Sequence, residues 1–435
     1  MQKLILSIAL IALVGLSACQ PTEEIIDEDN GGTTINVVKS ELAREVNPQV
    51  DQNQLNDLAR DNGIFALNFY DQIRTEDGNI IFSPFSLSLA LTMTLAGAET
   101  STEEGMLSAL QFSLSESAVH PAFNALLLAI EKSQEQNTGD MEGDQFQLNI
   151  ANSIWGQADF NFKQPFLDIL AQQYGAGIFT VDYKQNPESA RIAINDWVAE
   201  ETEEKIRDLI PAGAIDTLTR LVLANAIYFN GSWMHPFNLN ATSEAPFSKL
   251  DGSEINVDMM RLSGERLLYN RGDIFQFVTL PYMSSDFSMT LIVPNEGSFD
   301  QFERNFDYEG LSTILSSMSN ERVDLEMPKF DFESTVDAND PLIALGMGDA
   351  FDPGSADFSG ITDEEDLMIT DVLHKATITV DEQGTEAAAA TAIVVGVTSA
   401  MPEEPISLVI DRPFMFFIRH QPTNTILFMG RVIQP

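Results

Sequence analysis

Helical and strand-like hydrophobic periodicities alternate along the chain. Apolar side chains recur at three- and four-residue spacing over 56–73, which predicts an amphipathic helix, and 187–210 is predicted as a charged helix. Polar and apolar residues alternate over 147–155 as in a half-buried strand, and 279–294 has the pattern of a hairpin. The pattern therefore predicts a fold that mixes helices and strands.

One stretch, 380–400, departs from these patterns. It lies between two strand-like runs, 376–380 and 407–410, and carries no large side chain before Ile393. A connection of this length without a regular element is uncommon in a compact domain and usually marks a functional loop or a linker. The high helix propensity of the alanines in 385–390 favours a helix that begins at Thr385.

A strand is the alternative structure for 385–392, and it would divide the side chains between two faces. The two sets are Thr385, Ala387, Ala389 and Thr391 on one side, and Glu386, Ala388, Ala390 and Ala392 on the other. The first face is small enough to slide over a packed core. The only charge, that of Glu386, lies on the face that water can reach.

The first residues have the form of a secretory signal. A short basic start precedes an apolar core over 4–16, which is too short to span a membrane comfortably. Leu16-Ser17-Ala18-Cys19 resembles the lipobox of bacterial lipoproteins, in which the signal is removed before the cysteine and that cysteine is lipidated. We therefore expect a signal peptide over 1–18 and stable membrane attachment through acyl chains on Cys19. A buried free thiol in an uncleaved anchor is the alternative.

Cys19 is the only cysteine, so no disulfide is expected. The acidic, glycine-containing sequence after it predicts a flexible tether over 19–50. Its acidic cluster resembles the surface-export signal of some bacterial lipoproteins. We expect an outer-membrane lipoprotein, and whether it faces the periplasm or the outside stays open.

The composition is that of a globular protein with a large acidic excess. The 435 residues are 44% hydrophobic and 20% charged, which is ample material for a core. Lys and Arg number 23 against 66 for Asp and Glu, so the formal net charge is −43. This balance argues against binding to nucleic acid, heparin or anionic lipid.

Familiar catalytic motifs are absent from the sequence. There is no G-x-S-x-G elbow, no Walker A lysine loop and no G-x-G-x-x-G. The four histidines, His120, His235, His374 and His420, are far apart and form no H-E-x-x-H. With Cys19 lipidated, thiolate ligands for zinc are lacking as well. We expect no enzyme, no metal and no cofactor.

Motifs after residue 222 resemble, in order and spacing, those of the serpin family. They are 325–330 (LEMPKF), 358–361 (FSGI), 372–376 (VLHKA), 411–418 (DRPFMFFI) and 427–432 (LFMGRV), preceded by 223–233 (LANAIYFNGSW), which looks like a central strand and its turn. The segment 382–391 (EQGTEAAAAT) resembles the hinge of the reactive-centre loop of an inhibitory serpin. The resemblance implies one large α+β domain over 51–435. Its architecture would be a main mixed β-sheet, smaller sheets, surrounding helices and an exposed loop at about 382–405.

The resemblance also implies roles for particular residues. The hinge would comprise Glu382, Gly384, Thr385, Glu386, Ala387, Ala388, Ala389, Ala390 and Thr391. The region where the main sheet opens would contain Ser83, Ser86, Asn225, His374 and Trp233. His374 would be a hydrogen-bonding partner near Asn225 and Ser86, and Trp233 would cover the point where the loop enters. Ordinary roles are the alternatives: helix capping for Ser83 before Pro84, and core packing for the others.

The spacing of the family places the scissile bond between Thr398 and Ser399, with Val397–Thr398 as the competitor. Met401–Pro402 is a poor candidate, because proline is badly tolerated just after a cleaved bond. No Lys or Arg occurs between Gln383 and Ile410. A trypsin-like pocket would therefore have no basic side chain to hold.

We therefore predict a monomeric inhibitor that traps its target protease as a suicide substrate. Small Thr, Val and Ala side chains suit elastase-like or subtilisin-like serine proteases, and papain-like cysteine proteases remain an alternative. Two other functions stay open. One is a non-inhibitory, chaperone-like or binding protein of the same fold, and the other is a hydrolase or glycan-binding surface lipoprotein.

Overall fold

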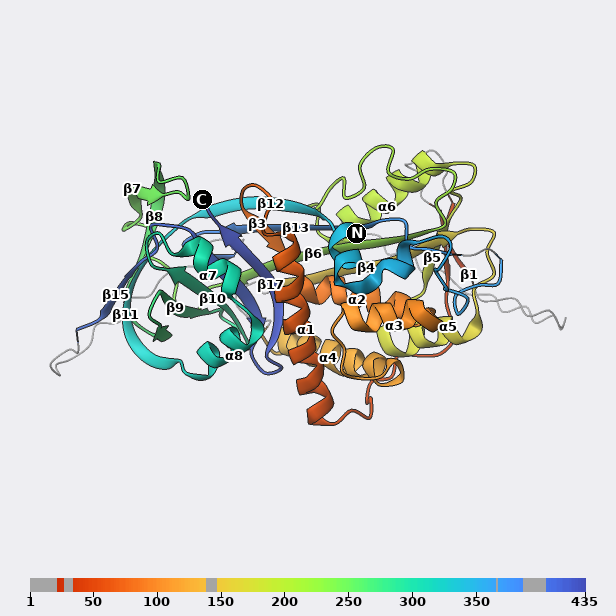
Figure 1. The fold of residues 1–435 in the computed structure, drawn as a ribbon, viewed down its shortest axis with the longest axis horizontal. Helices are drawn as coiled ribbons and strands as arrows, with labels where there is room; N and C mark the ends of the chain where they lie inside the picture. Colours follow the sequence, from red (N-terminus) through yellow and green to blue (C-terminus); the bar gives the residue numbers. More distant parts are fainter. Residues whose placement is uncertain (1–21, 27–33, 138–146, 365–366, 386–403) are drawn as a thin grey trace, which may run out of the picture.

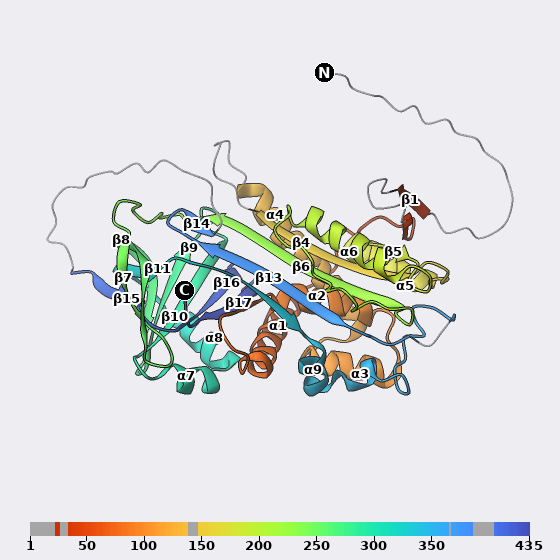
Figure 2. The same ribbon diagram turned by 90° about the horizontal axis from the view of Figure 1, so that it is seen from above.

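A main sheet of eight strands runs the length of the molecule (Figure 2). The computed structural model describes residues 22–26, 34–137, 147–364, 367–385 and 404–435. In spatial order the strands are β1 (Thr22–Ile26), β2 (Thr34–Val38), β5 (Ile178–Val181), β4 (Gln147–Gln157), β6 (Leu221–Ser232), β14 (Gly384–Thr385), β13 (Val372–Val380) and β12 (Phe330–Asp337). The β4–β5 and β6–β13 pairs are parallel and the others antiparallel. The predicted mixed sheet is therefore confirmed.

A second sheet lies at one end of the molecule (Figure 1). Its path is β15 (Ile406–Val409), β11 (Ser319–Pro328), β8 (Glu254–Arg271), β9 (Phe275–Pro281), β10 (Phe287–Pro294), β16 (Phe414–His420), β17 (Thr425–Val432) and β3 (Ile80–Phe82), with β7 (Ser243–Ser248) paired to β8. The strands expected to form several smaller sheets are thus hydrogen-bonded into one continuous second sheet. The predicted hairpin over 279–294 is the antiparallel pair of β9 and β10.

Helices cover both sheets. They are α1 (Gln52–Ile73), α2 (Pro84–Leu95), α3 (Thr100–Ala109), α4 (Glu116–Asn137), α5 (Gln164–Ile169), α6 (Pro187–Glu201), α7 (Phe299–Asn305), α8 (Tyr308–Ser316), α9 (Asn339–Leu342) and α10 (Gly348–Phe351), with π-helical turns η1 (Leu170–Tyr174) and η2 (Ile343–Met347). The predicted helix over 56–73 is α1. It begins earlier, because Asp51 and Gln54 form a capping box. None of the described helices is long and apolar enough to cross a membrane.

The two faces of the main sheet are buried by different helices. Leu223 and Ile227 of β6 face the core that α2 fills, whereas Ala224 and Ala226 face the cluster under α6. Figure 2 shows α6 and α2 on opposite sides of β6. Because side chains alternate along a strand, Asn225 must point toward α2. This alternation sets the orientation of the site described below.

The helix predicted over 187–210 ends nine residues early, so this prediction is wrong in its C-terminal part. The helix α6 stops at Glu201, and Glu203, Glu204 and Asp208 take positive φ angles that a helix cannot accommodate. Asn195 fixes the path of the chain after the helix, since its side chain both donates to and accepts from the backbone of Ile210 at 2.9 Å. This long-range contact has no signature in the helical pattern.

Residues 34–50 belong to the folded body, which begins within the stretch that composition assigned to the tether. The strand β2 pairs with β5 at the edge of the main sheet. Arg44 donates to Asn124 at 2.9 Å and pairs with Glu131 at 2.7 Å, both on α4. Strand β1, within the expected tether, also pairs with β2, so composition alone did not mark where folded structure starts.

Candidate functional site: a gap in the main sheet

The central strands β6 and β13 are in direct contact over only part of their length. They pair in parallel from Val372 opposite Leu223 to Ala376 opposite Ile227. Beyond these paired residues the two strands diverge, and β14 lies between them. Gly384 pairs with Ser232, and Thr385 pairs with Gly231 on one side and Val380 on the other. Gly384 and Thr385, two of the predicted hinge residues, thus already form a short strand in the gap.

Two aromatic side chains close the wide end of this gap. The rings of Trp233 and Tyr282 stack with centroids 4.6 Å apart. Trp233 donates its indole N–H to the carbonyl of Asp381 at 3.0 Å and its backbone N–H to the carbonyl of Gln383 at 2.8 Å. The hydroxyl of Tyr282 lies 2.8 Å from that of Thr385, and both residues are buried. Trp233 therefore holds the chain just before β14, and Tyr282 is a partner that the sequence analysis missed.

The carboxylate of Glu382, another predicted hinge residue, anchors the chain two residues before β14. It accepts hydrogen bonds from Lys329 at 2.7 Å and Thr242 at 2.6 Å, and its side chain is only 4% exposed. Burial by itself would raise the pKa of Glu382, but the bonds from Lys329 and Thr242 outweigh it and lower the pKa. Lys329 lies in the LEMPKF motif, yet the sequence alone assigned it no role.

A buried hydrogen bond joins the two strands at the narrow end of the gap. Nδ1 of His374 on β13 lies 2.5 Å from Oδ1 of Asn225 on β6, where the two residues are direct neighbours in the register. Nε2 of His374 accepts from the backbone N–H of Ser83 at 2.8 Å, so Nδ1 carries the proton and donates to Asn225. Burial lowers the pKa of His374 to about 3, which keeps the ring neutral.

The amide of Asn225 continues this network into α2. It donates to Ser86 at 2.9 Å and to Asn152 of β4 at 2.6 Å, and Ser86 in turn donates to Asn152 at 3.0 Å. The hydroxyl of Ser83 caps α2 by accepting from the backbone of Ser86 at 3.1 Å. The capping interpretation of Ser83 is thus confirmed, and its backbone N–H also places it beside His374; its role in sheet opening stays a prediction.

The structure therefore brings together Ser83, Ser86, Asn225 and His374 as predicted, and adds Asn152, which the sequence analysis missed. The signal for Asn152 was weak, because a polar residue within an alternating strand reads as solvent-facing. The hinge residues from Glu386 to Thr391, the reactive-bond residues Val397, Thr398 and Ser399, and Cys19 lie outside the described residues. Gly384 and Thr385 are extended, so the helix considered for 385–390 does not begin at Thr385.

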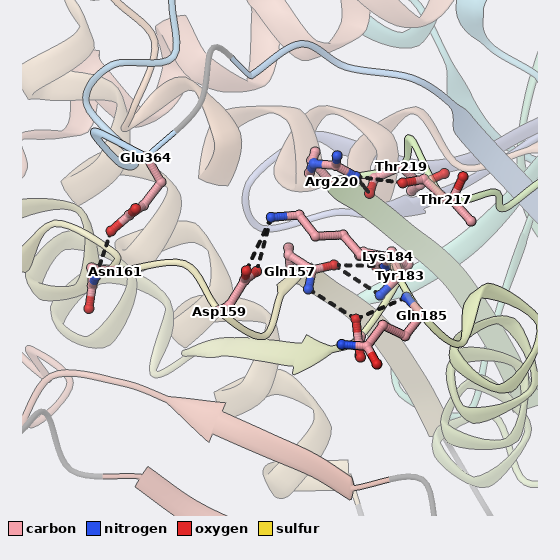
Figure 3. Close-up of polar contacts among 11 residues, drawn as sticks. Gln157, Asp159, Asn161, Tyr183, Lys184, Gln185, Thr217, Thr219, Arg220 and Glu364 are labelled. Carbon is pink, nitrogen blue, oxygen red and sulfur yellow. Dashed lines mark hydrogen bonds and ion pairs between the residues drawn. The ribbon is translucent and has the colours of Figure 1, made fainter.

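Polar contacts fix the loops at the far end of β4 and β6 (Figure 3). Gln157, the last residue of β4, accepts from the backbone N–H of Tyr183 at 2.9 Å, and Lys184 donates to Asp159 at 3.1 Å. Arg220, which directly precedes β6, donates to the carbonyls of Thr217 and Thr219 at 2.9 and 2.8 Å. The chain at this end of the gap is therefore held by side-chain contacts to the backbone.

Within the described residues, no group of three or more His, Cys, Asp or Glu side chains could hold a metal ion. The buried His374 faces an amide and a backbone N–H rather than a nucleophile. In the described part of the chain, the site consists of strand pairings and of hydrogen bonds between the strands.

A large sheet with a gap between its central strands, a buried hydrogen-bond network at the narrow end of the gap and a short strand at its wide end are typical of serpins. The family model for "Serpin (serine protease inhibitor)" matches residues 60–435, and the chain belongs to this family. Relatives include the leukocyte elastase inhibitor of Sus scrofa, 37% identical over 390 residues, which are 87% of this chain and 99% of that protein. A serpin-like protein of Thermococcus kodakarensis is 37% identical over 372 residues, which are 85% of this chain and 84% of that protein.

Solved structures agree with this assignment. The thermophilic serpin Tengpin in its native state superposes with a TM-score of 0.80 at 28% identity, covering 92% of this chain and all of that chain. Serpin48 of the insect Tenebrio molitor gives a TM-score of 0.74 at 30% identity, covering 89% of this chain and 99% of its own. Family and fold are thus those predicted from the motifs, and they support protease inhibition as the general function.

Proposed function

We propose that this protein inhibits its target protease by trapping it after cleavage of the loop that follows β14. The target forms an acyl-enzyme on the loop, and the hinge then inserts between β6 and β13 as a full strand. The single observation that carries the proposal is the position of Gly384 and Thr385, which already occupy this gap in antiparallel register with β6.

Continuing that register predicts where each hinge residue would lie. The partners of Thr385 are Gly231 and Val380. Thr391 is six residues after Thr385, and because the strands are antiparallel its partners would lie six residues before these two. Those residues are Asn225 and His374. Thr391 would therefore lie between Asn225 and His374, where a hydroxyl offers both a donor and an acceptor to replace their direct bond. The side chain of Thr385 points into the core toward Tyr282, so Ala387, Ala389 and Thr391 would face the core as well.

The same register accounts for the length of the loop. Val395 would lie opposite Leu221, the first residue of β6, which puts Thr398 just beyond the end of the strand. Roughly 14 inserted residues at about 3.3 Å each span on the order of 45 Å. An acyl-linked protease would thus be carried to the end of the sheet shown in Figure 3, and its deformation there would prevent hydrolysis of the acyl bond.

The residues around the proposed bond favour a particular class of target. Val397, Thr398 and Ser399 are small, and no basic residue lies between Gln383 and Ile410. We therefore assign elastase-like or subtilisin-like serine proteases as the targets, with papain-like cysteine proteases as the second choice. The relative from Sus scrofa is named for elastase inhibition, which agrees with this choice.

The proposal includes a membrane anchor. The leader over 1–18 and the lipobox-like sequence before Cys19 support a bacterial outer-membrane lipoprotein. In that setting the folded body, whose edge strand β1 begins at Thr22, would be held near the membrane by the short segment between Cys19 and β1. Globomycin, which blocks lipoprotein signal cleavage, tests this: it should cause a larger, unprocessed form to accumulate, whereas an unchanged size would exclude the anchor.

The trapping mechanism is tested with a soluble form that starts after Cys19, mixed separately with elastase, subtilisin and trypsin. A complex that resists denaturing electrophoresis should form with elastase or subtilisin, together with a released C-terminal peptide that begins at Ser399 or Thr398. Trypsin serves as the control and should give no such complex. Cleavage without a complex and without a gain in thermal stability would exclude trapping and indicate a non-inhibitory member of the family.

A further inference from the structure

Leu218, in the turn that leads into β6, is the most exposed large hydrophobic side chain of the described residues. Its exposed fraction is 76%, against 66% for Val46 and 60% for Leu239. Single exposed hydrophobic side chains are common on protein surfaces, so exposure alone assigns no function. Two further features distinguish Leu218: the turn that carries it and the place of that turn at the end of the main sheet.

Side-chain hydrogen bonds fix the backbone on both sides of Leu218. The carboxylate of Asp216 accepts from the backbone N–H groups of Leu218 at 2.7 Å and Thr219 at 3.0 Å. The hydroxyl of Thr219 accepts from the backbone N–H of Asp216 at 3.1 Å. Arg220 donates to the carbonyls of Thr217 and Thr219 (Figure 3). The turn is therefore held at both ends, and the side chain of Leu218 projects from it into solvent.

This turn lies where the register of the proposed insertion ends. Thr385 pairs with Gly231, and in an antiparallel pair each step forward on one strand is a step back on the other. Residue 398 is 13 positions after 385, and residue 218 is 13 positions before 231. Thr398, which would carry the acyl bond, therefore arrives at the level of Leu218, just past Leu221, where β6 begins.

We infer, on the basis of the proposed function, that Leu218 packs against the acyl-linked protease at the end of the main sheet and slows hydrolysis of the acyl bond. In that hydrolysis a water molecule adds to the acyl carbonyl of Thr398 and the ester bond to the serine of the protease breaks. One proton of the water returns to that serine, and the other leaves the new carboxyl group.

Hydrolysis is slow as long as the catalytic groups of the protease are displaced from the acyl carbonyl. Burial of Leu218 against the protease lowers the free energy of this displaced arrangement. Because the turn is fixed by its hydrogen bonds, the side chain cannot swing aside to let the catalytic groups realign. Leu218 is thus a positioning residue for the trapped protease.

The charges near this turn are directed to partners within the protein. Lys184 pairs with Asp159 at 3.1 Å and Lys163 pairs with Asp363 at 2.7 Å. The contact made by Leu218 depends on apolar area and not on a particular charge. It therefore suits any protease that accepts the loop, and its strength should not fall at high salt.

The rate at which active protease is released from the purified complex tests this contact. The parent protein, Leu218→Asp and Leu218→Met are each mixed with elastase, the complexes are isolated, and the recovered protease activity is followed over time. Leu218→Asp should release protease about tenfold or more rapidly than the parent protein, at low and at high salt. Leu218→Met keeps the apolar contact and should release it at the parental rate. Both free variants should unfold at the midpoint of the parent protein, because the position is exposed.

Leu239→Asp is the matched control. Leu239 is 60% exposed in the segment that follows the other end of β6, so this variant should release protease at the parental rate. Equal release from Leu218→Asp and the parent protein would refute the contact and leave trapping intact. A higher stoichiometry of inhibition for Leu218→Asp with unchanged release would place its effect on strand insertion and would also overturn the inference. A parent protein that forms no complex at all would refute the proposed function and this contact with it.

Discussion

His374 and Asn225 face each other across the two central strands of the main sheet, and the imidazole Nδ1–H of one donates to the amide oxygen of the other. This bond spans the line along which a new strand would have to enter. The same amide also donates to Ser86 and Asn152. The clamp therefore ties β13, β6, β4 and α2 together at one point, and opening the sheet requires its disruption.

Replacing Asn225 with alanine tests this clamp. Asn225→Ala leaves the donor of His374 without its acceptor, so we expect a loss of about 1–3 kcal/mol in the free energy of unfolding. The variant should also convert more rapidly to an inactive, loop-inserted monomer on incubation. The measurements are the thermal midpoint and the decay of inhibitory activity.

Asn195→Ala is the matched control. This buried amide makes two hydrogen bonds to Ile210 beside α6, away from the gap. Its loss should lower stability by a similar amount without accelerating inactivation. If both variants inactivate equally fast, general destabilisation, rather than the bond between His374 and Asn225, controls the opening of the main sheet.

Acid should lower the stability of the folded protein through His374. The pKa of this ring is lowered from 6.5 to about 3 in the folded protein. The stability it contributes is therefore fully present above pH 6.5 and is lost as the pH falls toward 3, because only the unfolded chain binds the proton in that range. The expected slope is up to about 1.4 kcal/mol per pH unit.

The pH effect is isolated by comparing the parent protein with His374→Asn. The pKa of the buried His420 is also lowered, to about 4, but His420 is present in both proteins and cancels in the difference. The difference in unfolding midpoint should shrink as the pH falls from 7 to 4. A difference that is constant with pH would show that His374 does not change protonation on unfolding.

Breaking the ion pair at the base of the hinge should destabilise the protein. Lys329→Met leaves the buried carboxylate of Glu382 unpaired, and we expect a loss of about 1–3 kcal/mol and a higher pKa for that carboxyl. The double variant with Glu382→Gln should recover part of the loss. Chemical denaturation of the parent protein, the two single variants and the double variant measures the coupling free energy between Lys329 and Glu382.

Lys163→Met is the control for this cycle. Lys163 is 34% exposed, close to the 36% of Lys329, but its partner Asp363 is 84% exposed. Losing this surface pair should cost less than about 1 kcal/mol. An equal loss in both variants would mean that burial of Glu382 gives the pair no special strength.

A methyl group at Gly384 should push the hinge strand away from β6. A Cβ there would lie 2.2 Å from the carbonyl oxygen of Gly231, which is backbone and cannot move aside cheaply. We expect Gly384→Ala to lower stability by about 1–3 kcal/mol and to change the fluorescence of Trp233, which is bonded to this segment. Gly348→Ala, where a Cβ meets no atom within 4 Å, should leave both properties unchanged.

The register predicts opposite outcomes for two neighbouring alanines of the hinge. After insertion Ala389 would lie opposite Ile227 and Ala376, both fully buried, so Ala389→Arg should block insertion and turn the inhibitor into a substrate. Ala388→Arg would lie on the opposite face, between the half-buried Thr377 and the buried Tyr228, and should retain more of the inhibition than Ala389→Arg. The stoichiometry of inhibition with elastase separates the two, and equal loss in both variants would refute the register.

Elements with local signals were predicted well. Ser83 and Pro84 mark the start of α2 through capping alone, and the alternation over 147–155 identified β4. What the sequence could not reveal are contacts between residues far apart in the chain. Tyr282 meets Thr385 across 103 positions, and the end of α6 is set by Asn195 and its partner Ile210. Such pairings depend on tertiary packing, which no local pattern encodes.

The position of Gly384 and Thr385 between β6 and β13 also bears on the speed of trapping. Joining a free segment to a sheet first costs the entropy of bringing its end to the right place, and only later rungs are gained without that cost. Here the first rungs exist before any protease arrives. In the proposed mechanism, insertion would only extend a strand that is already paired. Its rate would then be set by how fast the paired residues of β6 and β13 separate, with no slow initial encounter.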